Sequence, residues 1–120
     1  MDNKFYVSYE VAKLLKEKGY DRECISYYYD NCREVDYSFC GERNSTWEER
    51  CISAPTKAEA IDWLESKGIT IDIHWIRFND NRRWNYSIFN STCDIIDAKY
   101  IYPTRLEAEE AAIIKALELL

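Results

Sequence analysis

Glycine and proline are scarce in this sequence, with three and two residues among 120. A loop that cradles phosphate groups needs several closely spaced glycines, so this scarcity excludes nucleotide-binding loops of the Gly-rich type. It also leaves no flexible, low-complexity linker that would join two domains. A chain of this length buries enough surface to form a core without a metal or a disulfide. We therefore predict one domain that spans residues 1–120.

Long apolar runs are absent as well. No stretch approaches the roughly 20 apolar residues that a membrane helix needs, and the N-terminal stretch MDNKFYVSYE lacks the apolar segment of a signal peptide. The formal net charge of −6 disfavours a protein whose affinity comes from neutralising phosphates, so we do not expect nucleic acid as the partner. We expect a cytoplasmic protein that does not insert into a membrane.

Histidine occurs once, at position 74, and the cysteines lack the spacing of a metal site. Zinc fingers and ribbons use cysteine pairs separated by roughly two to four residues, whereas Cys24, Cys32 and Cys40 recur at wider intervals. A turn near Cys32 would place Cys24 and Cys40 opposite each other across a hairpin. Five cysteines without an export signal indicate reduced thiols. We recognise no catalytic, cofactor-binding or metal-binding residues, and we predict a protein that is not an enzyme and carries no cofactor.

Three segments carry the signals that start and end helices. The first begins at Ser8, a good N-cap, and ends before Gly19. The second runs from Thr56 to Gly68, and the third begins at Thr104. The last two open with the same pattern, Pro-Thr-basic-x-Glu-Ala, in which the threonine and the glutamate form a capping box. This recurring pattern marks where helices begin and does not indicate a catalytic or binding function.

Between the helices, apolar residues alternate with a period of two, which is typical of half-buried strands. We predict strands at residues 24–30, 34–40, 69–78, 84–89 and 95–102. Residues 79–83 form a turn, and residues 41–52 form an irregular loop with a short strand near its end. Short hairpins favour antiparallel pairing, so the predicted fold class is α+β. Its order is α-β-β-α-β-β-(β)-α, with a mainly antiparallel sheet and helices packed on one face.

The strand predicted at 69–78 has two different faces. Alternation places Ile71, Ile73 and Trp75 on one face, and Asp72 and His74 on the other. The polar row has two interpretations. It is either a small-molecule or catalytic site around the histidine or a solvated strand face.

Aromatic residues are frequent, with ten Tyr, four Trp and four Phe. In the run YYY at 27–29, at least one ring must point outward from any strand, and the segment around residues 79–84 combines arginines with a tryptophan. Tyr, Trp and Arg are enriched at protein interfaces. The candidate partner-binding residues are Tyr27, Tyr29, Trp47, Arg83 and Trp84.

Three stretches together carry a resemblance: LLKEKGY near the start, APTKAEAIDWLESKGITIDI in the middle and YPTRLEAEEAAIIKALELL at the end. In this combination the chain resembles small uncharacterised proteins of Bacteroides-type gut bacteria and their phages and prophages. The similarity covers most of the chain except residues 30–50, where the sequence has its own cysteine- and charge-rich insert. The resemblance implies a cytosolic location in a bacterium and no established activity, so it assigns no catalytic residue.

The leading functional hypothesis is a non-enzymatic protein-binding or accessory module of phage or prophage origin. It is motivated by the missing catalytic groups and the many aromatic residues. The alternative is self-association as a homodimer, with the third helix or an edge strand at the interface. A small-molecule or enzymatic site around His74 is the third hypothesis, and nucleic-acid binding is the fourth.

Overall fold

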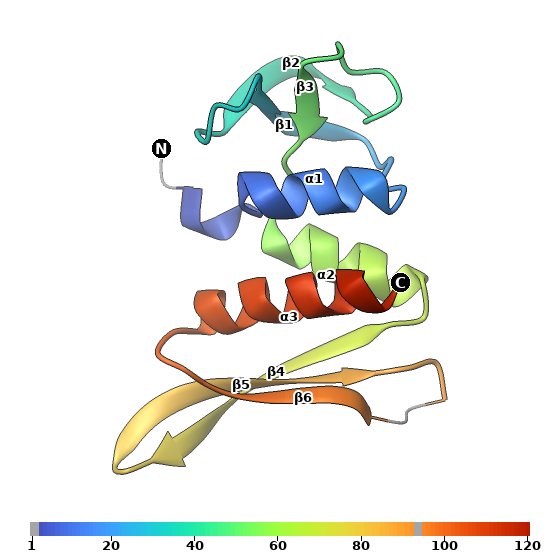
Figure 1. The fold of residues 1–120 in the computed structure, drawn as a ribbon. Coiled ribbons are helices and arrows are strands. Elements are labelled where there is room, and N and C mark those ends of the chain that lie inside the picture. The colour runs from blue at the N-terminus through green and yellow to red at the C-terminus, as the bar shows by residue number, and fades with distance from the viewer. Residues whose placement is uncertain (1–2, 93–94) are drawn as a thin grey trace. The chain divides into compact units, whose positions relative to one another are not determined.

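Three α-helices and six strands are present in the computed structural model, which describes residues 3–92 and 95–120 (Figure 1). The elements in chain order are a short 3-10 helix η1 (Asn3–Phe5), α1 (Tyr9–Glu17), β1 (Cys24–Tyr29), β2 (Asp36–Glu42), β3 (Cys51–Ser53), α2 (Lys57–Ser66), β4 (Thr70–Phe78), β5 (Asn81–Phe89), β6 (Ile95–Tyr102) and α3 (Arg105–Leu119). The predicted α+β class and element order are confirmed, and β3 is the short strand expected at the end of 41–52.

The strands form two three-stranded antiparallel sheets, with the orders β2-β1-β3 and β4-β5-β6. Internal contacts divide the chain into two compact units, Met1–Ala60 and Ile61–Leu120, so each sheet belongs to its own unit. We refer to them as the N-terminal and the C-terminal unit. The prediction of a single domain stays a prediction.

Each predicted helix start has the expected capping geometry. The Ser8 hydroxyl accepts from the Val11 amide at 3.2 Å and caps α1. The Thr104 hydroxyl accepts from the Glu107 amide at 3.2 Å and caps α3. At α2, the Thr56 hydroxyl accepts from the Glu59 amide while the Glu59 carboxylate accepts from the Thr56 amide at 2.9 Å. These reciprocal bonds satisfy amides that have no partner inside the helix.

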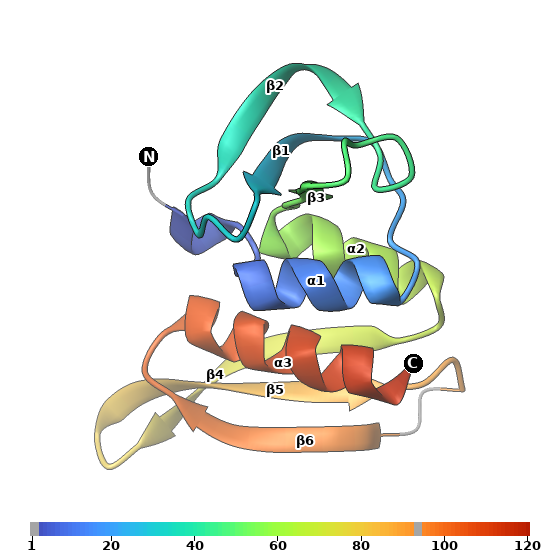
Figure 2. The same cartoon turned by 45° about the horizontal axis from the view of Figure 1, so that its top comes forward.

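In the N-terminal unit, β1 alternates strictly between a buried and an exposed side. Ser26 and Tyr28 are buried, while Tyr29 is exposed. Strand β2 arches away from β1 along part of its length (Figure 2), because Cys24 pairs with Glu42 and Ser26 already pairs with Tyr37. The extra residues of β2 therefore form a bulge.

Because of this bulge, Cys24 and Cys40 do not lie opposite each other as expected. Cys24 lies opposite Glu42 rather than opposite Cys40, and Cys40 is exposed whereas Cys24 is buried. The period-two pattern of 34–40 is compatible with an even hairpin, but it does not reveal the inserted residues. Phe39 in this part of β2 projects fully into solvent.

In the C-terminal unit, α3 lies along one face of the sheet formed by β4, β5 and β6 (Figures 1 and 2). The helix buries Ile113 and Leu117, and the covered face of the sheet contributes Ile71, Tyr86 and Ile88. Burial of such apolar side chains stabilises the unit by roughly 1.5–3 kcal/mol per side chain. The other face of this sheet has no helix over it within the unit.

The turn between β4 and β5 is shorter than the predicted 79–83. Only Asn79 and Asp80 lie in the turn, with φ of 49° and 62°. Asn and Asp tolerate this left-handed region, which a two-residue hairpin turn of the type I′ class requires at both positions. The strand β5 therefore starts at Asn81 and includes Arg82 and Arg83, which the sequence analysis assigned to the turn.

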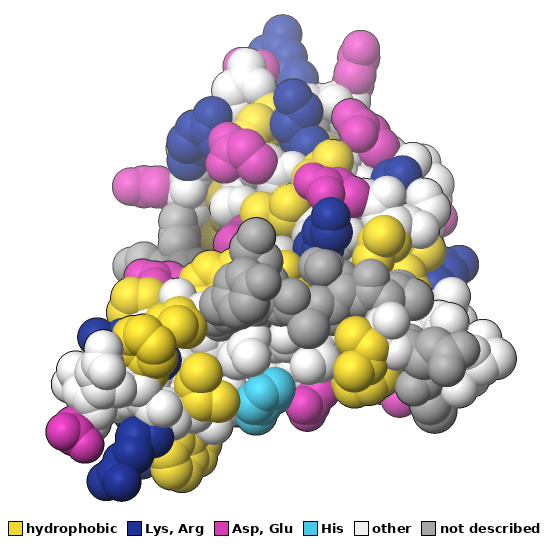
Figure 3. Space-filling view, turned by 60° about the horizontal axis from the view of Figure 1, so that its bottom comes forward, with side chains coloured by type: hydrophobic (Ala, Val, Ile, Leu, Met, Phe, Trp, Pro, Cys, Tyr) yellow, Lys and Arg dark blue, Asp and Glu magenta, His cyan; other side chains and the backbone are white. Residues whose placement is uncertain are grey.

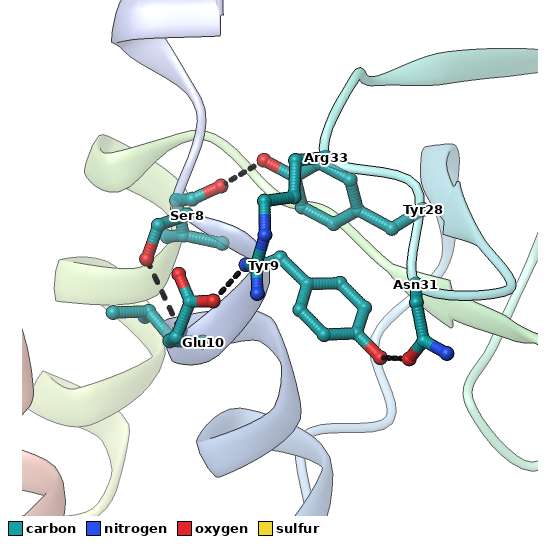
Figure 4. A network of polar contacts seen from close by, with 8 residues as sticks. Ser8, Tyr9, Glu10, Tyr28, Asn31 and Arg33 are labelled. Carbon is teal, nitrogen blue, oxygen red and sulfur yellow. Dashed lines mark hydrogen bonds and ion pairs between the residues drawn. The ribbon is translucent and has the colours of Figure 1, made fainter.

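The buried hydroxyl of Tyr28 provides a test of the N-terminal unit, because it donates to the Val7 carbonyl at 2.5 Å (Figure 4). Tyr28→Phe leaves this buried carbonyl without that donor and should lower the free energy of unfolding by about 1–3 kcal/mol. Tyr9→Phe is the matched control, because its hydroxyl donates to the Asn31 side chain at the surface, also at 2.5 Å. Urea denaturation should show a change within about 0.5 kcal/mol for the control. Equal losses in both variants would contradict this account.

Candidate functional site

The sheet face opposite α3 carries several exposed apolar side chains of the C-terminal unit. Ile71 and its cross-strand partner Ile88 point towards α3. Because side chains alternate along a strand, the residues next to them in the sequence point away from the helix. We call the opposite side the outer face and define it by Asp72, His74, Ile76 and Phe78 on β4, Arg83 and Phe89 on β5, and Ile95 at the start of β6.

Apolar side chains occupy both ends of the outer face. Phe78 is 46% exposed and lies beside the hairpin turn, with Ile76 partly exposed next to it. Phe89 and Ile95 pair with each other at the far end, and Ile95 is 62% exposed. Figure 3 looks onto this side of the sheet and shows hydrophobic side chains, in yellow, on both sides of the cyan histidine.

Charged groups of opposite sign lie towards the two ends of the same face. Asp72 Oδ2 and His74 Nδ1 are 3.1 Å apart on β4, and both side chains are exposed. Arg83 pairs across the strands with Ile76, near the hairpin turn, and its guanidinium donates to the Arg82 carbonyl at 2.9 Å. Within residues 3–92 and 95–120, no carboxylate forms an ion pair with Arg83. Among the described side chains of β4 and β5 on the outer face, Arg83 therefore places a positive charge towards the hairpin end, and Asp72, beside His74, places a negative charge towards the far end.

The predicted partners Arg83 and Trp84 do not share a surface. They are neighbours on β5, so Trp84 points to the face that carries α3, where the Arg105 guanidinium lies 5.5 Å above its ring. Trp75 pairs with Trp84 across the strands, and the Arg82 guanidinium lies 5.0 Å from the Trp75 ring. These cation–π contacts extend the helix-side packing towards the hairpin turn.

Trp75 is 55% exposed, although Ile71 on the same strand is buried. It does lie on the same face as Ile71, as predicted. The β4–β5 hairpin extends beyond α3 in Figure 1, so the helix does not cover this part of the face. Alternation along a strand identifies the face of a residue, but it does not reveal how far the covering helix reaches.

The other three predicted partner residues lie in the N-terminal unit. The rings of Tyr27 and Trp47 are 4.9 Å apart, and Trp47 Nε1 donates to the Ser53 hydroxyl at 2.7 Å. These contacts explain why a tryptophan stands in a polar loop. Burial and the nearby Asp36 carboxylate raise the pKa of Tyr27, so this phenol stays neutral at physiological pH. Tyr29 is 41% exposed on the same side of β1 as Tyr27.

The N-terminal unit also contains a polar pocket of about 520 Å³ between α1, the β1–β2 turn and the loop before β3. The Tyr9 ring at its edge lies 5.7 Å from the Lys13 ammonium and 5.0 Å from the Arg33 guanidinium, and Arg33 forms an ion pair with Glu10 (Figure 4). The charged lining residues are Lys13, Lys16, Glu17, Asp30, Glu49 and Arg50. Because acids and bases are balanced, this lining favours no particular ligand charge.

A second N-terminal pocket, of about 400 Å³, is lined by Tyr6, Glu23, Cys24, Ile25, Ser26, Thr56 and Glu59. Its Cys24 thiol donates to the Ser26 carbonyl at 3.2 Å, and its Glu59 carboxylate already caps α2. Neither of these two pockets contains His74, which lies on the open outer face. The histidine site proposed from the sequence therefore has no enclosed cavity around it in the described part of the chain.

No protein-family model, curated protein or solved structure matches this chain. Over the described residues, no group of three or more His, Cys, Asp and Glu side chains is arranged to hold a metal ion. No described helix combines the length and the apolar character needed to cross a membrane.

The residues that the sequence analysis missed are the apolar members of the outer face. Ile76 and Phe78 continue the row of Asp72 and His74, so the polar row becomes apolar towards the hairpin turn. Period-two counting to the end of the strand would have found them. Ile95 could not be found in this way, because its pairing with Phe89 follows a shift in the β5–β6 register.

The reactivity of the cysteines gives a direct test of which side chains are buried and which are exposed. Cys32 and Cys40 are exposed, Cys24 and Cys51 are buried, and burial raises the pKa of the Cys51 thiol. Because the thiolate is the reactive form, Cys51 should react slowly with a thiol reagent at neutral pH.

The experiment uses a Cys93→Ser background, since position 93 lies outside the described residues. Mass spectrometry after brief alkylation should show two thiols modified at least about tenfold faster than the other two. In urea all four should react at similar rates. Four equal rates in the folded protein would contradict the predicted exposures.

Proposed function

We propose that this protein is a non-enzymatic binding module that docks a protein partner on its outer face. The observation that carries the proposal is the exposed sheet face with Phe78 and Ile95 at its two ends. A face that exposes apolar side chains together with polar groups is typical of interaction sites. Removing such surface from water contributes roughly 25 cal/mol for each Å² of apolar area that the partner covers.

The composition of the outer face fits a protein partner. Phe78 and Arg83 belong to residue types that often dominate interface energetics, and Asp72 and His74 supply polar contacts. A β-sheet presents these side chains on a rigid backbone, so little conformational entropy is lost when the partner binds. A nucleic acid is disfavoured by the net charge of −6.

The cellular setting follows from the sequence resemblance alone. Similarity to small proteins of Bacteroides-type bacteria and their phages supports an accessory role in the bacterial cytoplasm, with phage or prophage origin. A module of this kind would act by occupying a surface of its partner rather than by catalysing a reaction.

Site-specific photocrosslinking tests the proposal. A photoreactive phenylalanine analogue replaces Phe78 on the outer face, and in a control protein it replaces Phe5, which is 54% exposed in the N-terminal unit. In the bacterium that encodes the chain, the Phe78 variant should form a discrete protein adduct, and Ile76→Ser in the same chain should reduce its yield. A similar adduct pattern from both positions, or none from Phe78, would contradict docking on the outer face.

A further inference from the structure

We infer that the partner on the outer face is a second copy of this chain, stacked face to face about a two-fold axis. The inference rests on the proposed function, since it names the occupant of the same surface. Its basis is that the two ends of the outer face carry charges of opposite sign and that both ends have exposed apolar side chains.

The hairpin end of the outer face carries Ile76, Phe78 and Arg83, and the far end carries Asp72, Phe89 and Ile95. Among these named side chains, each end combines apolar groups with one charged group, and the two charges are opposite. A two-fold interface brings the same patch of both copies together, so it requires a patch that complements itself.

The orientation of the second copy follows from the strand direction. A two-fold axis that lies between the two sheets and runs across the strands reverses the strand direction of one copy relative to the other. The hairpin end of each copy then lies over the far end of its neighbour. Sheets that stack in this way are about 10 Å apart, with interdigitating side chains. Because each strand then lies over the same strand of the second copy, Phe78 on β4 would lie over Thr70 of that copy and beside its Phe89.

The positions of the charged side chains favour this orientation over one in which the two-fold axis runs along the strands. With the axis across the strands, Arg83 lies near Asp72 of the second copy, and symmetry repeats this pair. With the axis along β5, Arg83 would instead lie over its own symmetry mate, and like charges in an interface are strongly unfavourable. Arg83 has no carboxylate partner among the described residues, so pairing with the second copy breaks no ion pair of its own.

The area of the outer face determines how tightly we expect two copies to associate. Strands β4 and β5 have nine residues each. Three strands of about that length cover roughly 30 Å by 14 Å, or about 400 Å² for each copy. Stable interfaces bury about 800 Å² for each partner, so a smaller contact belongs to the weak class. We therefore expect a dimer that forms at micromolar to millimolar protein concentration and becomes weaker as salt rises.

A charge exchange measured by sedimentation equilibrium tests the inference on the full chain. Arg83→Asp and Asp72→Arg should each weaken self-association at least about tenfold, because each places like charges together twice. An equimolar mixture of these two variants should associate again, since both contacts in the mixed dimer then join opposite charges. The double variant D72R/R83D should associate as the natural chain does, for the same reason.

Two further variants separate the outer face from other exposed apolar residues. Phe78→Ser should weaken association at least about tenfold, whereas Ile25→Ser, at a 53% exposed position in the N-terminal unit, should leave it unchanged. Thermal melts at low protein concentration, where all variants are monomers, should show that each one folds. Phe78 and Ile25 are exposed, so both substitutions are compatible with folding.

The outcomes distinguish the dimer from the proposed function. The inference is overturned if the natural chain remains a monomer at millimolar concentration, or if the mixed variants do not associate while the natural chain does. A photocrosslinked adduct between Phe78 and a different protein, together with a monomeric natural chain, would overturn the dimer and leave the proposed function standing. Absence of any Phe78 adduct would remove the proposed function as well.

Discussion

The register of the β4–β5 hairpin is the constraint on which the functional surface depends. Asn79 and Asp80 both adopt left-handed conformations, and the resulting two-residue turn aligns nine residue pairs without a shift. Because side chains alternate along a strand, a slip of one residue would exchange the two faces of the sheet. The apolar residues beneath α3 would then face solvent, and the outer face would be buried. The packing of α3 therefore stabilises the register that exposes Phe78 and places Arg83 on the outer face.

Much of the fold could be predicted because it is encoded locally. Ser8, Thr56 and Thr104 act as caps whose hydrogen-bond partners lie only three residues away, so the sequence pattern contains the whole interaction. The alternation of β4 likewise identified the helix-facing row. Boundaries were less accurate, because β5 begins inside the segment that was assigned to the turn.

The candidate site was harder to predict, because exposure is a property of tertiary structure. Trp84 and Trp47 are as apolar in the sequence as Phe78, yet one lies near Arg105 and the other packs against Tyr27. Only Arg83 of the predicted partner residues belongs to the outer face. The bulge that exposes Phe39 and separates Cys24 from Cys40 also depends on pairing between distant residues, which no local pattern specifies.

The most direct test of the account is to measure the methyl NMR spectrum of the full chain as its concentration rises. Isoleucine methyl groups report on both faces of one sheet, since Ile76 and Ile95 belong to the outer face while Ile71 and Ile88 lie beneath α3. The account predicts concentration-dependent shifts for Ile76 and Ile95 and constant shifts for Ile71 and Ile88. Shifts confined to Ile71 and Ile88, or equal shifts on both faces, would contradict it.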